Sequence, residues 1–115
     1  VARRDRPVLS LSGDGSAMYT LQSLWTQARE QLNVTTVIYA NRSYAILHGE
    51  LRNVGAQPGK NTRRLFDLEN PNLNWVEMAC GMGVDGVRVE TAEELHQAMS
   101  HGLSTPGPYL IEAIC

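Results

Sequence analysis

The sequence lacks the features that mark several classes of protein. Its 115 residues include only two cysteines, Cys80 and Cys115, which supply neither a disulfide framework nor the spacing of a metal site. No apolar run approaches the ~20 residues that a membrane-spanning helix needs. Residues 1–6 are basic but have no apolar stretch of the kind found in a secretory signal. We therefore expect a cytoplasmic protein that does not associate with membranes.

Positive charge is also scarce. The net charge is -2, whereas nucleic-acid-binding domains usually carry a clear basic excess on one face, so we expect no nucleic-acid partner. His48, His96 and His101 are scattered and lack the spacing of a zinc pair. A chain of this length forms one domain and buries roughly 65% of its unfolded surface. We therefore expect a single core.

Strands and helices alternate along most of the chain. Strands are predicted near residues 7–12, 34–40, 85–90 and 109–114, and their nearly continuous apolar content is typical of strands that are covered on both faces. This order indicates an α/β fold with a mostly parallel sheet and helices on both faces.

Three helices are predicted between and after these strands. The longest spans residues 16–31 and places a stripe of apolar residues at steps of three and four: Ala17, Met18, Leu21, Leu24, Trp25, Ala28 and Leu32. Asn74 can cap a short helix that Gly83 ends. Thr91 and Glu94 have the spacing of a capping box at the start of the last helix.

Residues 46–74 are the least regular part of the sequence. A short helix over residues 45–52 can begin this segment, and residues 55–60 are predicted to be a mobile connection. Loops this long in compact domains are usually functional or disordered.

The triplet Gly13-Asp14-Gly15 lies between the first strand and the first helix. A helix of about 16 residues runs roughly 24 Å from this turn, and a strand of about 8 residues returns roughly 26 Å. Because these lengths nearly cancel, Asp14 and Asn41 are expected to meet at the carboxyl ends of neighbouring parallel strands. Open α/β sheets bind their ligands at this edge.

The residue types at this edge fit a magnesium-bound diphosphate. Mg²⁺ prefers hard oxygen ligands, often one or two from the protein together with phosphate oxygens. Asp14 and Asn41 offer such oxygens, and the main-chain carbonyl of Ser43 is a third candidate. Gly13 and Gly15 permit close backbone approach. At the helix start, where the helix dipole favours anions, the candidate donors to phosphate oxygens are the amides of Gly15, Ser16 and Ala17 and the hydroxyl of Ser16.

The triplet also allows two other interpretations. Glycine-Asp-glycine is a common turn signal by itself. A dinucleotide-binding fingerprint would need glycine at position 18, where this chain has Met18.

With these residues in place, the chain resembles the carboxyl-terminal, cofactor-binding domain of thiamine-diphosphate enzymes. The family motif is a glycine-Asp-glycine triplet followed, after an interval, by an Asn-Asn pair. Gly13-Asp14-Gly15-Ser16 and Ala40-Asn41 match it, except that Ala40 replaces the first Asn. The surrounding sequence, through Tyr44 and on to residues 107–112, is similar to acetolactate synthase large subunits and benzoylformate decarboxylase, so the resemblance covers almost the whole chain.

The resemblance implies a set of roles. Mg²⁺ would be held by Asp14, Asn41 and the carbonyl of Ser43, and thiamine diphosphate would be bound by the positions Gly13, Asp14, Gly15, Ser16, Ala17, Asn41, Ser43 and Tyr44. By the same analogy, Leu47 and Glu50 are candidates to face a 2-oxo acid substrate. No residue is predicted to be catalytic, because the family places the chemistry on the cofactor.

The resemblance further implies a chain that is one part of an enzyme. Residues 1–115 would be a carboxyl-terminal domain that is truncated at its N-terminal side and inactive alone. An N-terminal pyrimidine-binding domain of the same or a partner subunit would complete it, in a homodimer or tetramer. The leading hypothesis is an acetolactate-synthase-like decarboxylase or carboligase. The alternatives are a benzoylformate-decarboxylase-like lyase, a non-catalytic paralogue with the same fold, and a nucleotide-binding Rossmann-like domain.

Overall fold

The computed structural model describes residues 5–115. Residues 1–4, which are part of the basic stretch discussed above, lie outside the described residues. A four-stranded sheet in the order β1-β2-β4-β3 forms the centre of the molecule, and all its neighbouring strands are parallel. The strands are β1 (Val8–Gly13), β2 (Val34–Ala40), β3 (Asp85–Val89) and β4 (Tyr109–Ile114). The predicted fold class and strand positions are confirmed.

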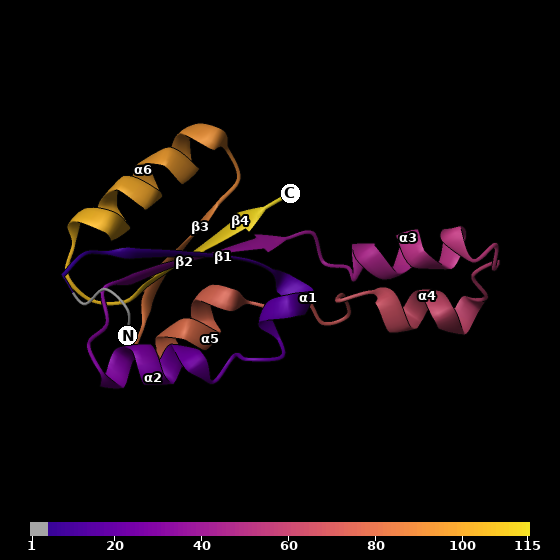
Figure 1. Ribbon diagram of the computed structural model, residues 1–115, viewed down its shortest axis with the longest axis horizontal. Helices are drawn as coiled ribbons and strands as arrows, with labels where there is room; N and C mark the ends of the chain where they lie inside the picture. The colour runs from indigo at the N-terminus through magenta and orange to yellow at the C-terminus, as the bar shows by residue number, and fades with distance from the viewer. Residues whose placement is uncertain (1–4) are drawn as a thin grey trace.

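Helices cover both faces of the sheet (Figure 1). One face carries α1 (Asp14–Ala17), α2 (Ser23–Arg29) and α5 (Trp75–Gly81), and the other carries α6 (Ala92–Ser104). A core cluster lies on each face. The first contains Leu24, Ile38, Trp75 and Leu110, among others, and the second is built around β2, β4 and α6.

The prediction of one continuous helix over residues 16–31 is wrong. The chain forms the single turn α1, then a run of turns, and then the seven-residue α2. Within this run the backbone hydrogen bonds join residues three apart, as from the Thr20 N–H to the Ala17 carbonyl at 3.1 Å. Such turns keep apolar residues on roughly one side, because three residues per turn is close to the α-helical 3.6.

Two predicted caps are confirmed. The Asn74 side chain accepts a hydrogen bond from the Glu77 N–H at 3.2 Å at the start of α5. At the start of α6, Thr91 and Glu94 form the reciprocal capping box. Each cap gives a partner to an N–H group that has none within the helix at its start.

Between β2 and α5 the chain forms an arm that projects from the carboxyl edge of the sheet (Figure 1). The arm consists of α3 (Ala45–Asn53) and α4 (Lys60–Phe66), and neither helix has a buried residue. It lengthens the molecule to 49 Å against 29 and 25 Å in the other directions. The helix over residues 45–52 was predicted, but α4 was not.

Candidate functional site

Asp14 and Asn41 leave the sheet at the same edge. Gly13, the last residue of β1, is paired with Tyr39 near the end of β2, so the residues that follow these strands lie side by side. The contact is direct, because the Asp14 Oδ2 accepts a hydrogen bond from the Arg42 N–H at 2.6 Å. The structure thus brings together the two segments that the sequence placed at one site.

The Asp14 carboxylate is buried, with 2% of the residue exposed. Its Oδ1 accepts a hydrogen bond from the Gly15 N–H at 2.8 Å, and its Oδ2 accepts the one from Arg42. Among residues 5–115, Asp14 forms no ion pair. An ionised carboxylate has about four lone-pair positions, so two amides hold it in place and leave acceptor capacity for a cation.

Asn41 and Ser43 form a tight turn next to this carboxylate. The Asn41 Oδ1 accepts a hydrogen bond from the Ser43 N–H at 3.0 Å, which is the pattern of an Asx turn. Arg42, between them, has a φ of 56°, a left-handed conformation that is uncommon for residues other than glycine. The turn carries the chain from the end of β2 into the arm.

The backbone of Ser43 has a defined orientation. Ser43 forms an antiparallel bridge with Asp67, and the flanking hydrogen bonds run from Tyr44 N–H to Phe66 O and from Leu68 N–H to Arg42 O, each at 2.8 Å. In such a bridge the N–H and C=O of Ser43 itself point away from the partner segment. The Ser43 carbonyl therefore points to the same side as the Ser43 N–H, which donates to the Asn41 side chain. The Ser43 hydroxyl is turned instead to the Phe66 carbonyl, at 3.2 Å.

Gly15 is needed for the close approach of an aromatic ring. A Cβ atom at this position would lie 2.6 and 2.7 Å from Cδ1 and Cε1 of Tyr44, which is closer than real carbon atoms pack. Gly15 and Tyr44 were both predicted to be cofactor-binding positions, and the structure places them in contact. The N-terminal turn of α1 therefore has a bare backbone beside an aromatic side chain.

The amides at the start of α1 differ from expectation in one respect. The Gly15 N–H is occupied by Asp14, and α1 has only four residues. A single turn aligns few peptide dipoles, so the predicted contribution of a long helix dipole is reduced. Ser16 is exposed and Ala17 packs in the core.

The two candidate substrate residues are on the arm. Leu47 is 39% exposed and Glu50 is also exposed. Both lie on α3, beyond the turn at Ser43. This helix has no buried residue.

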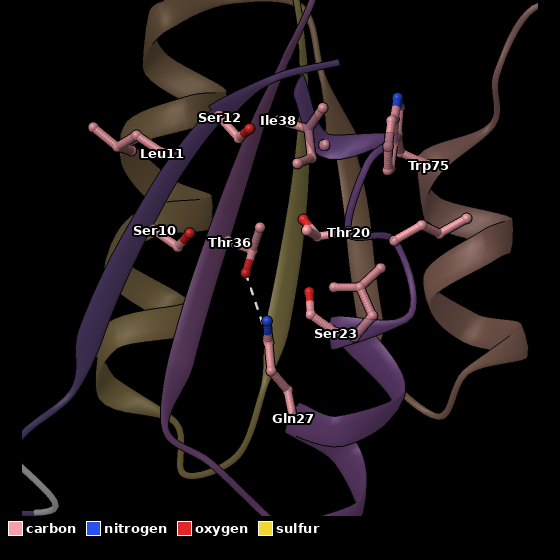
Figure 2. Close-up of a pocket in the computed structure, with 12 residues that line it drawn as sticks. Ser10, Leu11, Ser12, Thr20, Ser23, Gln27, Thr36, Ile38 and Trp75 are labelled. Carbon is pink, nitrogen blue, oxygen red and sulfur yellow. Dashed lines mark hydrogen bonds between the residues drawn. The ribbon is translucent and has the colours of Figure 1, made fainter. Parts of the chain in front are cut away.

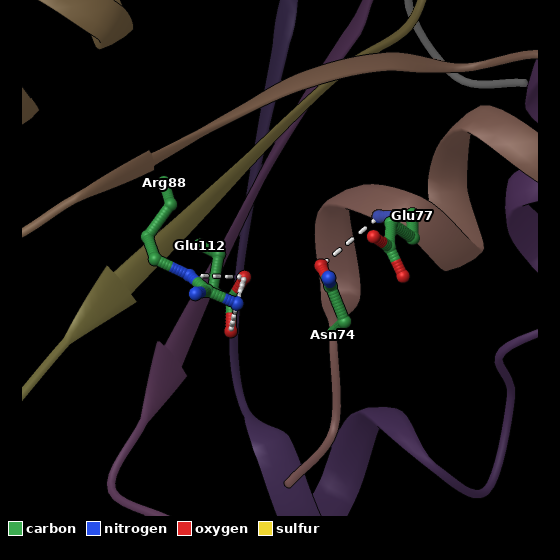
Figure 3. A network of polar contacts seen from close by, with 4 residues as sticks. All are labelled: Asn74, Glu77, Arg88 and Glu112. Carbon is green, nitrogen blue, oxygen red and sulfur yellow. Dashed lines mark hydrogen bonds and ion pairs between the residues drawn. The ribbon is translucent and has the colours of Figure 1, made fainter.

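Two charged residues near this edge were missed by the sequence reasoning. Glu112 on β4 is 2% exposed, and both its oxygens contact the Arg88 guanidinium of β3, at 3.1 and 3.3 Å (Figure 3). A glutamate inside the apolar run of residues 109–114 was the available signal. Arg88 gives the buried Glu112 carboxylate its hydrogen-bond donors, and it also places a positive charge on the edge strand β3.

The donor set distinguishes between metals. Among residues 5–115 no group of three or more His, Cys, Asp or Glu side chains could hold a metal ion. A site made from one carboxylate, one carboxamide and one main-chain carbonyl has only hard oxygen donors. Such a set fits Mg²⁺ and not zinc.

Comparison with known proteins decides the family. The model of the thiamine pyrophosphate enzyme C-terminal TPP binding domain matches residues 1–113. The chain belongs to this family. It is 51% identical to a Mycobacterium tuberculosis protein named as an acetolactate synthase large subunit, IlvX, over 99% of this chain and 22% of the relative. It is 32% identical to benzoylformate decarboxylase of Pseudomonas aeruginosa, over 97% of this chain and 20% of the relative.

Solved structures agree with the sequence relatives. The thiamine diphosphate-dependent 4-hydroxybenzoylformate decarboxylase of Rhodococcus jostii RHA1 superposes with a TM-score of 0.82 at 37% identity, covering 96% of this chain and 20% of that protein. The chain thus spans about a fifth of the length of these relatives. Within residues 5–115, no helix has the length and apolarity that crossing a membrane requires.

Proposed function

We propose that this domain binds thiamine diphosphate through Mg²⁺, as part of an acetolactate-synthase-like 2-oxo-acid decarboxylase or carboligase. The observation that supports this proposal is the 2.6 Å hydrogen bond from the Arg42 N–H to the Asp14 carboxylate, which joins Asp14 to the turn of Asn41 and Ser43 at the carboxyl edge of the sheet. Family membership identifies the cofactor. The oxygen donors of Asp14, Asn41 and Ser43 support Mg²⁺ as the metal.

Each residue has a role that its position supports. The buried Asp14 carboxylate, the Asn41 carboxamide oxygen and the Ser43 carbonyl would hold Mg²⁺. At the start of α1, the cofactor's diphosphate would be held by the backbones of Gly13, Gly15, Ser16 and Ala17 and by the side chains of Ser16 and Tyr44.

The cofactor, when bound, supplies the nucleophilic carbon and the electron sink that decarboxylation of a 2-oxo acid requires. The residues described above bind and orient it, and none of them is proposed to be catalytic. We further propose that an N-terminal pyrimidine-binding domain, of the same or a partner subunit in a homodimer or tetramer, completes the site. The 115 residues alone are then inactive, and the complete protein is cytoplasmic.

A benzoylformate-decarboxylase-like lyase is the second candidate. Its support is the 37% identity to the Rhodococcus jostii enzyme, whose substrate is an aromatic 2-oxo acid by name. The 51% identity to the Mycobacterium tuberculosis relative favours the first candidate. In either case Leu47 and Glu50 on the arm are proposed to face the substrate.

The proposal is tested by titration calorimetry of the 115-residue chain with thiamine diphosphate, in the presence and absence of Mg²⁺, with NAD and ATP as competitors. We expect binding that depends on Mg²⁺ and that Asp14→Asn weakens by more than about tenfold, because a metal ligand is lost. Asp85→Asn, which changes an exposed carboxylate at the opposite ends of the strands, is the matched control. Equal binding by Asp14→Asn and wild type, or tighter binding of NAD or ATP, would contradict the proposal.

A further inference from the structure

The edge strand β3 directs backbone groups away from the sheet. Among residues 5–115, β3 pairs only with β4. The Cys115 N–H donates to the Ala40 carbonyl at 3.3 Å, so Cys115 faces β2. Because alternate residues of a strand point to opposite sides, Leu110 faces β3 instead. Its register partner Gly86 therefore points outward, as does Arg88 two residues on, since paired residues of a parallel ladder do not face each other.

The charges on β3 leave the middle of this edge open. Charged side chains on edge strands usually prevent pairing with another strand. The Arg88 guanidinium, however, is turned to the buried Glu112 carboxylate (Figure 3). Glu112 shares a face of the sheet with Leu110, which packs with Trp75 of α5, so the charge of Arg88 is neutralised on the α5 side. Asp85 is the first residue of the strand and lies at its end.

On the opposite face, a hollow of about 320 Å³ lies between β3 and α6. Val87 borders it from the strand and is only partly buried. Four residues of α6 border the hollow at steps of three and four, which places them on one side of the helix: Glu94, Gln97, Ala98 and His101. The helix therefore leaves part of the edge strand uncovered.

Strand β3 can pair with a second copy of itself, antiparallel about Val87. Gly86 then lies opposite Arg88 of the second copy, and both residues direct their N–H and C=O groups into the space between the strands, as a hydrogen-bonded pair requires. All five residues of the strand overlap in this register, and Val87 meets its own copy beside the hollow. A register centred on Arg88 would set two arginines opposite each other, which is unfavourable.

The side of α6 that borders the hollow is complementary to itself. A two-fold axis between Gln97 and Ala98 sets Glu94 of each copy opposite His101 of the other. The capping bonds of Glu94 use its Oε2, so its Oε1 can accept a hydrogen bond from the imidazole of the second copy. The ring of His101 is held beside the hollow by an edge-to-face contact with Tyr109, at 5.0 Å between centroids.

One axis can serve both the strand and the helix. From Val89 back to Val87 the strand covers about 6.6 Å. From Ala92 to the midpoint between Gln97 and Ala98 the helix covers about 8 Å. Both distances begin at the carboxyl edge of the sheet, so the two centres lie at nearly the same level.

We infer that β3 and α6 form the contact by which two copies of this chain associate, in a two-fold dimer whose sheet is continuous across the two β3 strands. The strand supplies the backbone hydrogen bonds, and the oppositely charged groups of Glu94 and His101 orient the two helices. The side chains of Gln97 and His101 from both copies close the hollows. No residue of the proposed cofactor site takes part, so the inference holds or fails independently of the proposed function.

The other edge of the sheet is the competing surface. Leu9 and Leu11 of β1 are 38% and 57% exposed. A cavity of about 170 Å³ lies beside this strand, and Figure 2 shows the Gln27 side chain reaching Thr36 within it. None of the residues that line this cavity is charged, so it offers no pair of opposite charges to orient a second copy. The α6 side of the molecule does.

The first test is sedimentation velocity of the 115-residue chain. We expect a reversible dimer that His101→Glu weakens at least about tenfold, because each new carboxylate lies opposite Glu94 of the other copy. Adding Glu94→Gln, which preserves the capping box, should restore most of the association. His96→Glu is the matched control, since His96 is an exposed residue of α6 that does not border the hollow.

Two results of this experiment would overturn the inference. One is a wild-type chain that stays monomeric at about 100 μM, a concentration at which a micromolar contact is nearly saturated. The other is equal association of His101→Glu and His96→Glu.

Amide hydrogen exchange locates the contact in the wild-type chain and needs no variant to fold. Raising the protein concentration through the association should slow the exchange of the Gly86 and Arg88 amides at least about tenfold. The Val87 amide, which faces β4, is the internal reference. Slowing at the outward amides of β1 in place of β3 would assign the dimer to the opposite edge of the sheet, and would overturn the inference.

Discussion

The contact between Gly15 and Tyr44 gives the most direct test of the site geometry. In Gly15→Ala the new Cβ would lie 2.6 Å from the Tyr44 Cδ1, whereas carbon atoms pack at about 3.5–4.0 Å. The ring must therefore move by about 1 Å. The main chain of Tyr44 cannot follow freely, because its N–H is bonded to the Phe66 carbonyl.

The magnitude follows from two opposing terms. Overpacking of this kind costs about 1–3 kcal/mol, while replacing glycine with alanine inside a helix stabilises by about 1 kcal/mol. Gly49→Ala is the matched control, since Gly49 is also helical and a Cβ there meets nothing within 4 Å. Gly15→Ala should therefore be less stable than Gly49→Ala by about 1–3 kcal/mol, because the helix term cancels.

The assay is urea unfolding followed by circular dichroism, with the free energies compared at equal m-value. In a Tyr44→Ala background, adding Gly15→Ala should cause no such loss of stability, because the ring that the new Cβ would meet has been removed. Equal stabilities of Gly15→Ala and Gly49→Ala would refute the reasoning, as would a double variant in which the two effects simply add.

Two further predictions concern charged residues. Arg88→Met should lower the free energy of unfolding in urea by about 2–3 kcal/mol, which is less than for a fully buried pair because the Arg88 side chain is 43% exposed. Adding Glu112→Gln should recover part of this loss, because no unpaired carboxylate then remains buried. A loss below about 0.5 kcal/mol for Arg88→Met would contradict this prediction. The pKa of the Glu94 carboxyl lies below its ordinary value of 4.5, because the carboxylate accepts hydrogen bonds from the amides of Glu90 and Thr91. The Glu94 carboxylate therefore stabilises the fold at pH values above that ordinary pKa, and this contribution is lost as the pH falls through the lowered pKa. In thermal unfolding across pH, Glu94→Gln should be less stable than wild type at neutral pH and equal to it in strong acid. A constant difference at all pH values would contradict this prediction.

The strands and their meeting point could be predicted because the signals are local. Continuous apolar runs marked the strands, and the glycines at Gly13 and Gly15 marked where the first one ends. The helix length entered that argument with the wrong value, since α1 and α2 are separate. The prediction held because strand pairing, with Gly13 opposite Tyr39, fixes the edge whatever path the chain takes between the strands.

The parts that failed depend on tertiary contacts. Ala17 and Leu24 are both buried, yet a stripe with steps of three and four is equally compatible with one helix or with two joined by turns. Met18 and Trp25, which belong to the predicted apolar stripe, are 38% and 53% exposed. The helix α4 has the sequence KNTRRLF, whose two apolar residues, Leu65 and Phe66, are adjacent, so there is no apolar periodicity to detect.

The structure shows why Ala40 can replace the first Asn of the family motif. Ala40 is 3% exposed and is paired with Ile114 inside the sheet, whereas Asn41 follows the strand and is exposed. Successive side chains of a strand point to opposite faces, so a residue at position 40 cannot share the direction of the Asn41 carboxamide. The anchor of Asp14 is the backbone N–H of Arg42, which no substitution at position 40 removes. Loss of the first Asn of the pair therefore leaves all three proposed magnesium donors in place.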